Sequence, residues 1–543
     1  MVNVGKKIWK RGDLFIWLTG AGLALSLIIT VALLLGIVVN AMGTFWPGEI
    51  RILHLNDGSQ VLGTQVGREV IPDFSSGAKR VDIHRIQIKK ANRDIYTSDF
   101  IWVDESAIKS IETPENVVAV ERREWGYFFG FIKEIVDKDK SLAQGTAEGL
   151  KTATNILPLT RALNKEIATI AKKEIGAINH KMERVRLKLK KLSLKGMTQG
   201  EELDALNQEI PELQSQYNVL EKKLNALRSS QTGKIILQTV EGQEISLPLS
   251  QMLDIYNPNQ FSLLDKALFF LKGVQKFLWD DPREANTEGG VFPAIFGTVL
   301  MVLMMSVLAT PLGVLAAFYL REYAKQGTLV SIVRIAVNNL AGVPSIVFGV
   351  FGVGFFIYII GGSIDQLFFP EALPTPTFGT GGILWASLTM ALLTVPVVIV
   401  STEEGLAAVP KGTREASLAL GATKFETTWR VILPAVMPSI LTGLILAMAR
   451  AAGEVAPLMI TGVVKLAPSL PIDGLWPFIH LERKFMHLGF HIYDVGFQSP
   501  NVDAARPMVF ATTLLLILMV ILLNMAAIYL RNRLRKQLTA SAV

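Results

Sequence analysis

Residues 415–434 read EASLALGATKFETTWRVILP, a polar stretch that lies between two long apolar runs. The run before it covers about Gly381–Thr402, and the run after it covers about Met437–Val463. Each run exceeds the roughly 20 residues that a membrane-spanning helix needs. The sequence therefore predicts that the chain crosses a membrane on both sides of this stretch.

The stretch itself carries the signals of a helical elbow. Gly421 interrupts a helix-forming pattern, and glycine favours the bend that follows a helix. Thr423 and Glu426 have the spacing of a capping box, which starts a new helix. Pro434 marks the return toward the next apolar run. We therefore expect residues 415–434, here called the elbow, to form helix, glycine bend and helix at the membrane surface.

The whole composition is that of an integral membrane protein with a sizeable polar part. Half of the 543 residues are hydrophobic, 19% are charged, and the mean hydropathy is +0.38. Apolar runs that are long enough to span a bilayer occur at about Leu14–Val39, Val291–Leu320, Leu329–Ile360, Gly381–Thr402, Met437–Val463 and Met508–Leu530. The predicted fold class is an α-helical polytopic membrane protein with six transmembrane helices.

Several chemistries are excluded by what the sequence lacks. It has no cysteine, which rules out disulfides and thiolate metal sites, and its six histidines form no H-E-x-x-H pattern. It has no G-x-x-x-x-G-K-[ST] loop. We therefore predict no catalytic residues, no metal site and no cofactor in this chain; ATP and Mg, if used, are bound by another chain.

Basic residues in short loops predict the orientation of the chain. They occur before the first run, after the second, after the fourth and after the last, at Lys6, Lys7, Lys10, Arg11, Arg321, Lys325, Lys411, Arg414, Lys424, Arg430, Arg531, Arg533, Arg535 and Lys536. With both termini cytoplasmic, all of these residues lie on the cytoplasmic side. The net charge of +7 is therefore attributed to membrane orientation and not to nucleic-acid binding. Residues 44–290 are then periplasmic or extracellular.

The predicted domains follow from this topology. Residues 1–43 hold the cytoplasmic N-terminus and the first spanning helix, which we expect to be an uncleaved anchor. Residues 44–285, here called the insert, form an extracytoplasmic α+β domain. Its β-rich parts are expected at about 49–125 and 233–250, and apolar spacings of three and four predict a coiled-coil-like helical hairpin at about 160–230. Residues 286–543 hold the remaining five spanning helices.

The elbow resembles a conserved loop of the permeases of ABC importers. Their pattern is E-A-A-x3-G-x9-I-x-L-P, and the positions that match it or depart mildly from it include Glu415, Ala416, Ser417, Gly421, Leu433 and Pro434. In that family the loop, here expected at about 403–436, docks into a groove of the ATP-hydrolysing subunit. The resemblance implies a type I ABC importer permease core and coupling to an ATPase through these residues.

Further stretches resemble the phosphate permease subunits called PstA. These are NTEGGVFPAIFGT at 286–298, VPSIVFGVFG at 343–352 and ARAAGEVAPLMITG at 449–462. The resemblance implies import of inorganic phosphate across the inner (cytoplasmic) membrane. The implied partners are a homologous second permease chain, a dimer of ATP-binding ABC subunits, a soluble phosphate-binding protein and the membrane lipid. The large insert departs from the family, and Val400 stands where members often have Arg.

Two charges inside an apolar run are candidates for the substrate pathway. Arg450 and Glu454 are four residues apart, which places them on one face of a helix. Charges at mid-membrane are costly and usually functional. The pair is either an ion pair that holds helices together or a transient contact for phosphate, because guanidinium binds two phosphate oxygens at once.

Two alternative functions stay open at this point. One is a permease for another oxyanion, such as phosphonate, molybdate or sulfate. The other is a membrane sensor or scaffold derived from a permease. The intact elbow argues against a scaffold, which has no need of an ATPase-docking element.

Overall fold

The computed structural model describes residues 13–73, 81–138, 140–197, 199–499 and 502–540. Within these residues, six helices are long and apolar enough to cross a membrane, as predicted. They are built from α2 (Asp13–Phe45), α8 (Phe292–Phe318), α10 (Ser345–Phe351) with α11 (Gly362–Phe368), α12 (Ile383–Ala408), α15 (Leu433–Gly453) and α18 (Val502–Ala540). The basic cluster at Lys6–Arg11 lies outside the described residues.

Prolines break two of the predicted runs. The run Leu329–Ile360 is divided into α9 (Thr328–Leu340) and α10, because Pro344 has no backbone N–H and disfavours helix in the residue before it. The run Met437–Val463 ends at Gly453 and resumes as α16 (Ala456–Thr461). Pro457 accounts for this break, since a proline ring clashes with the carbonyl four residues earlier, here that of Gly453.

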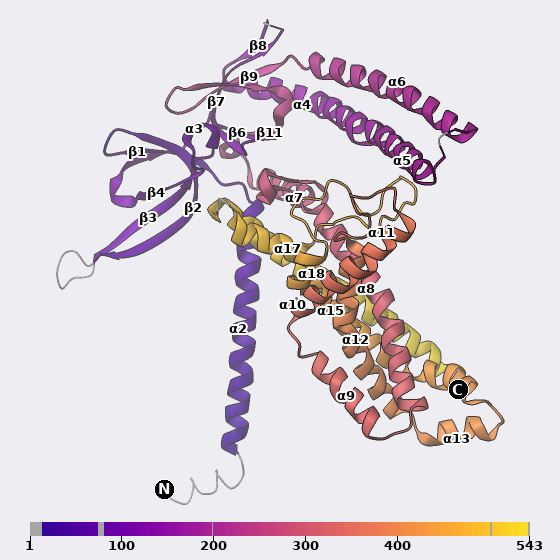
Figure 1. Cartoon of the computed structure of the whole chain (residues 1–543). Coiled ribbons are helices and arrows are strands. Elements are labelled where there is room, and N and C mark those ends of the chain that lie inside the picture. The colour runs from indigo at the N-terminus through magenta and orange to yellow at the C-terminus, as the bar shows by residue number, and fades with distance from the viewer. Residues whose placement is uncertain (1–12, 74–80, 139, 198, 500–501, 541–543) are drawn as a thin grey trace, which may run out of the picture.

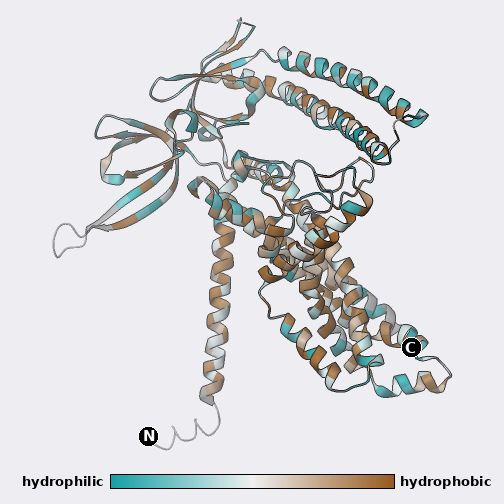
Figure 2. Cartoon of the chain, viewed as in Figure 1, coloured by the Kyte–Doolittle hydropathy of each residue, from teal (hydrophilic) through white to brown (hydrophobic). Residues whose placement is uncertain are grey.

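The membrane bundle is organised around α12, which packs between α8 and α15 (Figure 1). Small residues let α12 and α15 approach closely: a Cβ on Gly443 would lie 2.7 Å from the Cβ of Ser401. The Ser401 hydroxyl also donates a hydrogen bond to the Ser439 carbonyl at 2.6 Å. Helix α2 contacts α18 near its C-terminal end, where the Thr44 hydroxyl donates to the Pro507 carbonyl at 3.2 Å. Over most of its length it exposes its apolar side chains (Figures 1 and 2).

The insert begins with an antiparallel sheet in the order β4-β3-β2-β1-β5. A hairpin turn at Asn56-Asp57-Gly58 joins β1 and β2, and Gly58 adopts the positive φ of 86° that this turn needs. The strands and the short helix of this part are β1 (Ile50–Leu55), β2 (Gln60–Asp73), β3 (Val81–Lys89), α3 (Arg93–Tyr96), β4 (Phe100–Asp104) and β5 (Ile108–Glu112).

A second sheet follows in the order β10-β9-β7-β6-β11, with β8 paired to β7. Its strands are β6 (Val118–Arg122), β7 (Tyr127–Asp137), β8 (Lys140–Gln144), β9 (Lys234–Gln238), β10 (Glu244–Pro248) and β11 (Met252–Tyr256). The predicted β-rich limits of 125 and 250 were therefore too narrow. The sheet extends to 144 and 256 because β7 and β11 bury apolar residues in its core, among them Phe128, Ile135 and Ile255.

The helical hairpin comprises α4 (Thr146–Thr169), a π-helical stretch at Ile170–Glu174, α5 (Ile175–Leu194) and α6 (Glu201–Ser230). It begins at 146 and not near the predicted 160, because Ala153 and Leu157 are buried against the second sheet. Helices α5 and α6 pack through an apolar seam that includes Ile178, Val185, Leu192, Leu206 and Leu213.

The hairpin also contacts the loops at the insert's end of the membrane bundle. Lys191 approaches the Glu371 carboxylate at 3.4 Å, and Lys190 donates a hydrogen bond to the Leu373 carbonyl. The Arg184 guanidinium lies over the Trp476 ring, 5.8 Å from its centroid. The insert therefore reaches across the loops that connect the spanning helices.

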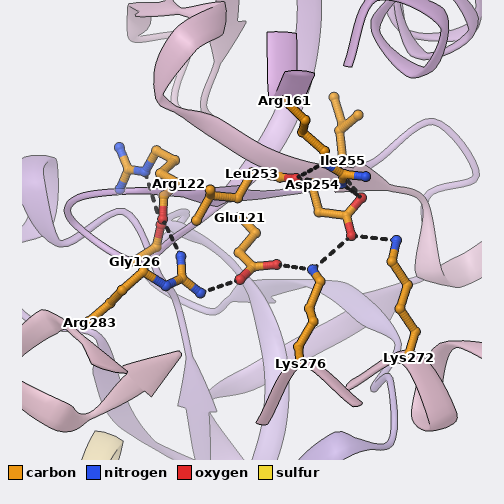
Figure 3. A network of polar contacts seen from close by, with 10 residues as sticks. All are labelled: Glu121, Arg122, Gly126, Arg161, Leu253, Asp254, Ile255, Lys272, Lys276 and Arg283. Carbon is orange, nitrogen blue, oxygen red and sulfur yellow. Dashed lines mark hydrogen bonds and ion pairs between the residues drawn. The ribbon is translucent and has the colours of Figure 1, made fainter. Parts of the chain in front are cut away.

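A network of ion pairs ties the second sheet to α7 (Leu263–Trp279), as Figure 3 shows. Lys276 binds both Glu121 at 2.8 Å and Asp254 at 3.0 Å, and Lys272 binds Asp254 at 2.7 Å. Arg283 pairs with the other oxygen of Glu121. Burial alone raises the pKa of Glu121, but the attraction of Lys276 and Arg283 outweighs burial and holds that pKa below its ordinary value.

A left-handed turn gives a second connection between the insert and the bundle. Glu284, Ala285 and Asn286 all have positive φ, a conformation that costs roughly 1–2 kcal/mol per residue. Glu284 binds Arg93 at 2.7 Å on the insert side. The Asn286 amide donates to the Lys465 carbonyl at 3.1 Å, and Asn286 is buried. Contacts on both sides thus hold a strained turn in place.

Removing the amine of Lys276 should loosen the insert. Lys276→Met leaves the buried Glu121 and Asp254 carboxylates underpaired, which costs about 3 kcal/mol or more. Lys172→Met is the matched control, because its pair with Asp281 is exposed on both sides and contributes at most about 1 kcal/mol. Chymotrypsin digestion over a temperature series should cleave the insert of the Lys276 variant earlier. Equal cleavage of both variants would contradict a structural role for the network.

Candidate functional site: the elbow and a central ion pair

The first half of the elbow is the end of α13 (Lys411–Ala419) followed by the glycine bend. Gly421 has φ of +87°, as the predicted bend requires. The Ala422 amide donates to the Ser417 carbonyl at 3.3 Å, and the Gly421 amide donates to the Leu418 carbonyl at 3.0 Å. These two bonds form a Schellman motif, in which glycine is favoured at the left-handed position.

The second half of the elbow runs directly into a spanning helix. Thr423 and Glu426 make the predicted capping box at the start of α14 (Lys424–Glu426). A π-helical stretch at Thr427–Ile432 continues into α15. Leu433 and Pro434 therefore lie in the first turn of α15 and are half-buried. The predicted loop of 403–436 comprises the end of α12, then α13, α14, the π-helical stretch and the start of α15. The helix starts at the Thr423–Glu426 capping box, before the apolar run begins, and it continues from there into α15.

The tip of the elbow presents an exposed, partly apolar surface. Glu415, Ala416 and Gly421 are exposed, whereas Ser417 is half-buried and bonds Thr427 at 2.9 Å. Leu420 is 90% exposed, and the exposed rings of Phe425 and Trp429 stack 6.3 Å apart. Exposed apolar side chains gathered on one element are typical of a protein-binding surface.

Arg414 anchors the elbow to the rest of the bundle. Its guanidinium binds Glu322, in the π-helical stretch Tyr319–Tyr323 that ends α8, at 2.8 Å. It also donates to the carbonyls of Leu406 at 2.8 Å and Val409 at 2.7 Å. The sequence does not reveal this role of Arg414, because Arg414 looks like one of many basic residues at a membrane surface. No local pattern links it to Glu322, which is 92 residues away.

Arg450 and Glu454 meet at 3.5 Å, so the structure brings the predicted pair together. The helix around them differs from the prediction, which placed both residues within one continuous helix. Helix α15 ends at Gly453, and Glu454 is its C-cap with an extended ψ of 137°. The side chains are 34% and 23% exposed, so the pair is reachable from outside the chain. The pair therefore sits at a break in the spanning helix.

A cation of α9 binds α12 one turn beyond Val400. Val400 is half-buried on α12, and one turn further on Glu403 binds Arg334 of α9 at 2.9 Å. Arg334 also donates to Gln326 at 3.3 Å. Over the described residues, no group of three or more His, Cys, Asp or Glu side chains is placed to hold a metal ion.

Together, these features are those of a helical membrane protein with an exposed, partly apolar elbow and an ion pair at a helix break. A model of the family "binding-protein-dependent transport system inner membrane component" matches residues 309–536. The chain belongs to this family, the permease subunits of ABC importers, and is therefore an inner-membrane protein. The insert lies outside the matched residues.

Known relatives agree with this assignment. The probable ABC transporter permease protein YqgI of Bacillus subtilis is 30% identical over 258 residues, which is 47% of this chain and 81% of that protein. The phosphate transport system permease protein PstA of Yersinia pestis is 35% identical over 45% of this chain and 74% of its own length. PstA 1 of Mycobacterium tuberculosis strain H37Rv is 34% identical over 45% and 70%.

Two glycines, Gly412 in α13 and Gly421 in the bend after it, test whether the bend stabilises the elbow. An added Cβ meets open space at both Gly421 and Gly412, but only Gly421 has positive φ. Gly421→Ala should destabilise the elbow by about 1–2 kcal/mol, whereas Gly412→Ala should leave α13 unchanged or more stable by up to about 1 kcal/mol. Hydrogen exchange of the α13 amides should therefore accelerate roughly fivefold to thirtyfold in the first variant alone. Equal exchange in both variants would show that the bend does not hold the elbow.

Proposed function

We propose that this permease subunit moves inorganic phosphate inward across the cytoplasmic membrane. The observation that carries the proposal is the similarity to PstA proteins over about three quarters of their length, in a region that contains the Arg450–Glu454 pair. A guanidinium next to a helix break suits a tetrahedral oxyanion, because its donor fork can bind two oxygens. Phosphonate, molybdate and sulfate are the competing substrates.

The partners proposed for this chain are those of an ABC importer. A homologous second permease chain completes the pathway, a dimer of ATP-binding subunits binds ATP and Mg, and a soluble binding protein delivers phosphate. The exposed Leu420, Phe425 and Trp429 with Glu415 support docking of the ATP-binding subunit on the elbow. The elbow, the basic loops and both termini then face the cytoplasm, and residues 44–290 face outward.

The coupling route follows from the continuity of the helices. Movement of the ATP-binding subunits displaces α13, which Arg414 holds to Glu322 at the end of α8. The same movement reaches α15 through the capping box and the π-helical stretch. Because Arg450 lies in the last turn of α15, a shift of the elbow changes the position of Arg450 relative to α12.

At the ion pair, Glu454 competes with phosphate for the guanidinium. A carboxylate partner orients Arg450 between transport events, and it limits how tightly the anion is held. A transport pathway needs this balance, since a site must both accept and release its substrate. Glu454 lies beyond the end of α15, so it can move away from Arg450 without unwinding a helical turn.

Substitutions at the pair should separate binding from release. Arg450→Gln removes a charge-assisted contact of about 1.5–3 kcal/mol and should lower kcat/KM for phosphate roughly tenfold to a hundredfold. Arg450→Lys keeps the charge but loses the fork, and should give an intermediate defect. Glu454→Gln should lower both KM and kcat, because phosphate is then held more tightly. Uptake kinetics in proteoliposomes measure these values, and wild-type kinetics in Arg450→Gln would contradict the assigned role.

The function as a whole is tested by the ATPase activity of the purified importer. Phosphate-loaded binding protein should stimulate ATP hydrolysis by the wild-type complex, and molybdate or sulfate should not replace phosphate. Glu415→Lys should abolish the stimulation because it alters the exposed tip of the elbow. Glu221→Lys, the same substitution on the exposed surface of α6, is the control and should retain stimulation. Stimulation by another oxyanion alone would reassign the substrate.

A further inference from the structure

Helix α7 contacts the last residue of α2 and the first residue of α8. Phe45, the last residue of α2, contacts Phe270 and Phe277 of α7 with ring centroids 6.2 Å and 5.3 Å apart. At its other end, Trp279 stacks on Phe292, the first residue of α8, at 5.6 Å. A helix of 17 residues that is tied in this way to the end of one span and the start of the next lies at the level of the span ends.

One face of α7 exposes leucines in a continuous stripe. Leu264, Leu268 and Leu271 are 70%, 57% and 62% exposed, and their spacing of four and three residues places them on the same side. Trp279 is also exposed, as is Trp46 directly after α2. Tryptophan at this level is typical of the boundary between lipid tails and headgroups. The pattern is that of an interfacial amphipathic helix.

Another face of α7 is bound to the insert. Lys272 and Lys276 point toward Asp254 and Glu121 of the second sheet, as Figure 3 shows. Lys272 follows Leu268 by four positions, which is slightly more than one turn, and Lys276 follows Leu264 by twelve positions, which is about three and a third turns. On average, the lysine face therefore lies about a quarter turn from the leucine face around the helix. The helix therefore has one side occupied by protein and a neighbouring apolar side uncovered within the described residues.

The surroundings of α7 suit lipid headgroups. A cavity of about 510 Å³ opens beside it, lined by Trp46, Arg51, Arg68 and Lys266 among others. Glu49 shares this lining and pairs with Arg51 at 3.0 Å and Lys266 at 3.8 Å. Arg68 is already paired with Glu105 at 2.7 Å, so Arg51 and Lys266 against the single Glu49 leave one net positive charge. This charge favours the phosphate groups of phospholipids.

We propose that α7 lies in the lipid leaflet on the insert's side of the membrane, with its leucine stripe among the acyl chains. Lipid is the occupant of the stripe. Through the Lys276 network, this contact fixes the height of the second sheet and of the helical hairpin above the bundle. The inference concerns the insert and does not depend on which oxyanion the importer carries.

Labelled cysteines test this placement, since the native chain has no cysteine. Leu264→Cys, Leu268→Cys and Leu271→Cys are each labelled with bimane in the assembled importer, in nanodiscs that contain phospholipid brominated near the top of its acyl chains. Leu159→Cys is the matched control, because Leu159 is a 72% exposed leucine on α4 of the insert. Brominated lipid should quench the three α7 labels strongly and iodide weakly, and the control should show the reverse.

Two results would overturn the proposal. Quenching of the α7 labels by iodide and not by brominated lipid would place the stripe in water. Protection from both quenchers would show that the second permease chain covers the stripe. Neither result changes the substrate or the elbow, so a failure here is separate from a failure of the proposed function.

Discussion

A helix inside a bilayer must satisfy its backbone hydrogen bonds without water, and this constraint shapes the whole molecule. Unbroken helices can face lipid, and α2 is unbroken and exposes apolar side chains over most of its length (Figure 2). Breaks are tolerated only where neighbours or a cavity satisfy the freed groups. In the described chain, such breaks follow Leu340 and Gly453 in the bundle. The break after Gly453 lies beside the Arg450–Glu454 pair, so a helix break and two charges in an apolar run occur together.

Because of the same constraint, a displacement at one end of a spanning helix is carried along the helix to its other end. Helical structure continues from the Thr423 cap to Gly453, so a displacement at the membrane surface reaches the ion pair without passing through a loop. Arg414 links that surface to α8, and the packing of α12 between α8 and α15 carries the movement across the bundle. On the other side, the insert is held by the Lys276 network and by the strained turn at Glu284–Asn286. The elbow is thus connected to the bundle at one end, and the insert is connected to it at the other end.

Local chemistry made much of this predictable from the sequence. The apolar runs gave the spans, and the bend at Gly421 and the capping box at Thr423 depend only on neighbouring residues. The Arg450–Glu454 contact follows from a spacing of four, although α15 ends between them at Gly453. Non-local pairings were out of reach: β7 pairs with β9 across the entire hairpin, and Arg414 meets Glu322 from 92 residues away. No sequence period reports which distant partner a strand or a charge selects.

The central claim is that this chain carries phosphate into the cell. The most direct measurement is uptake of radiolabelled phosphate at low micromolar concentration, in cells that lack other phosphate importers, with and without this gene. We expect ATP-dependent uptake that is lost with the gene, restored by the intact gene and suppressed by excess unlabelled phosphate but not by molybdate, sulfate or phosphonate. Unchanged uptake without the gene would show that phosphate is not the substrate, and molybdate, sulfate and phosphonate would then be tested as substrates.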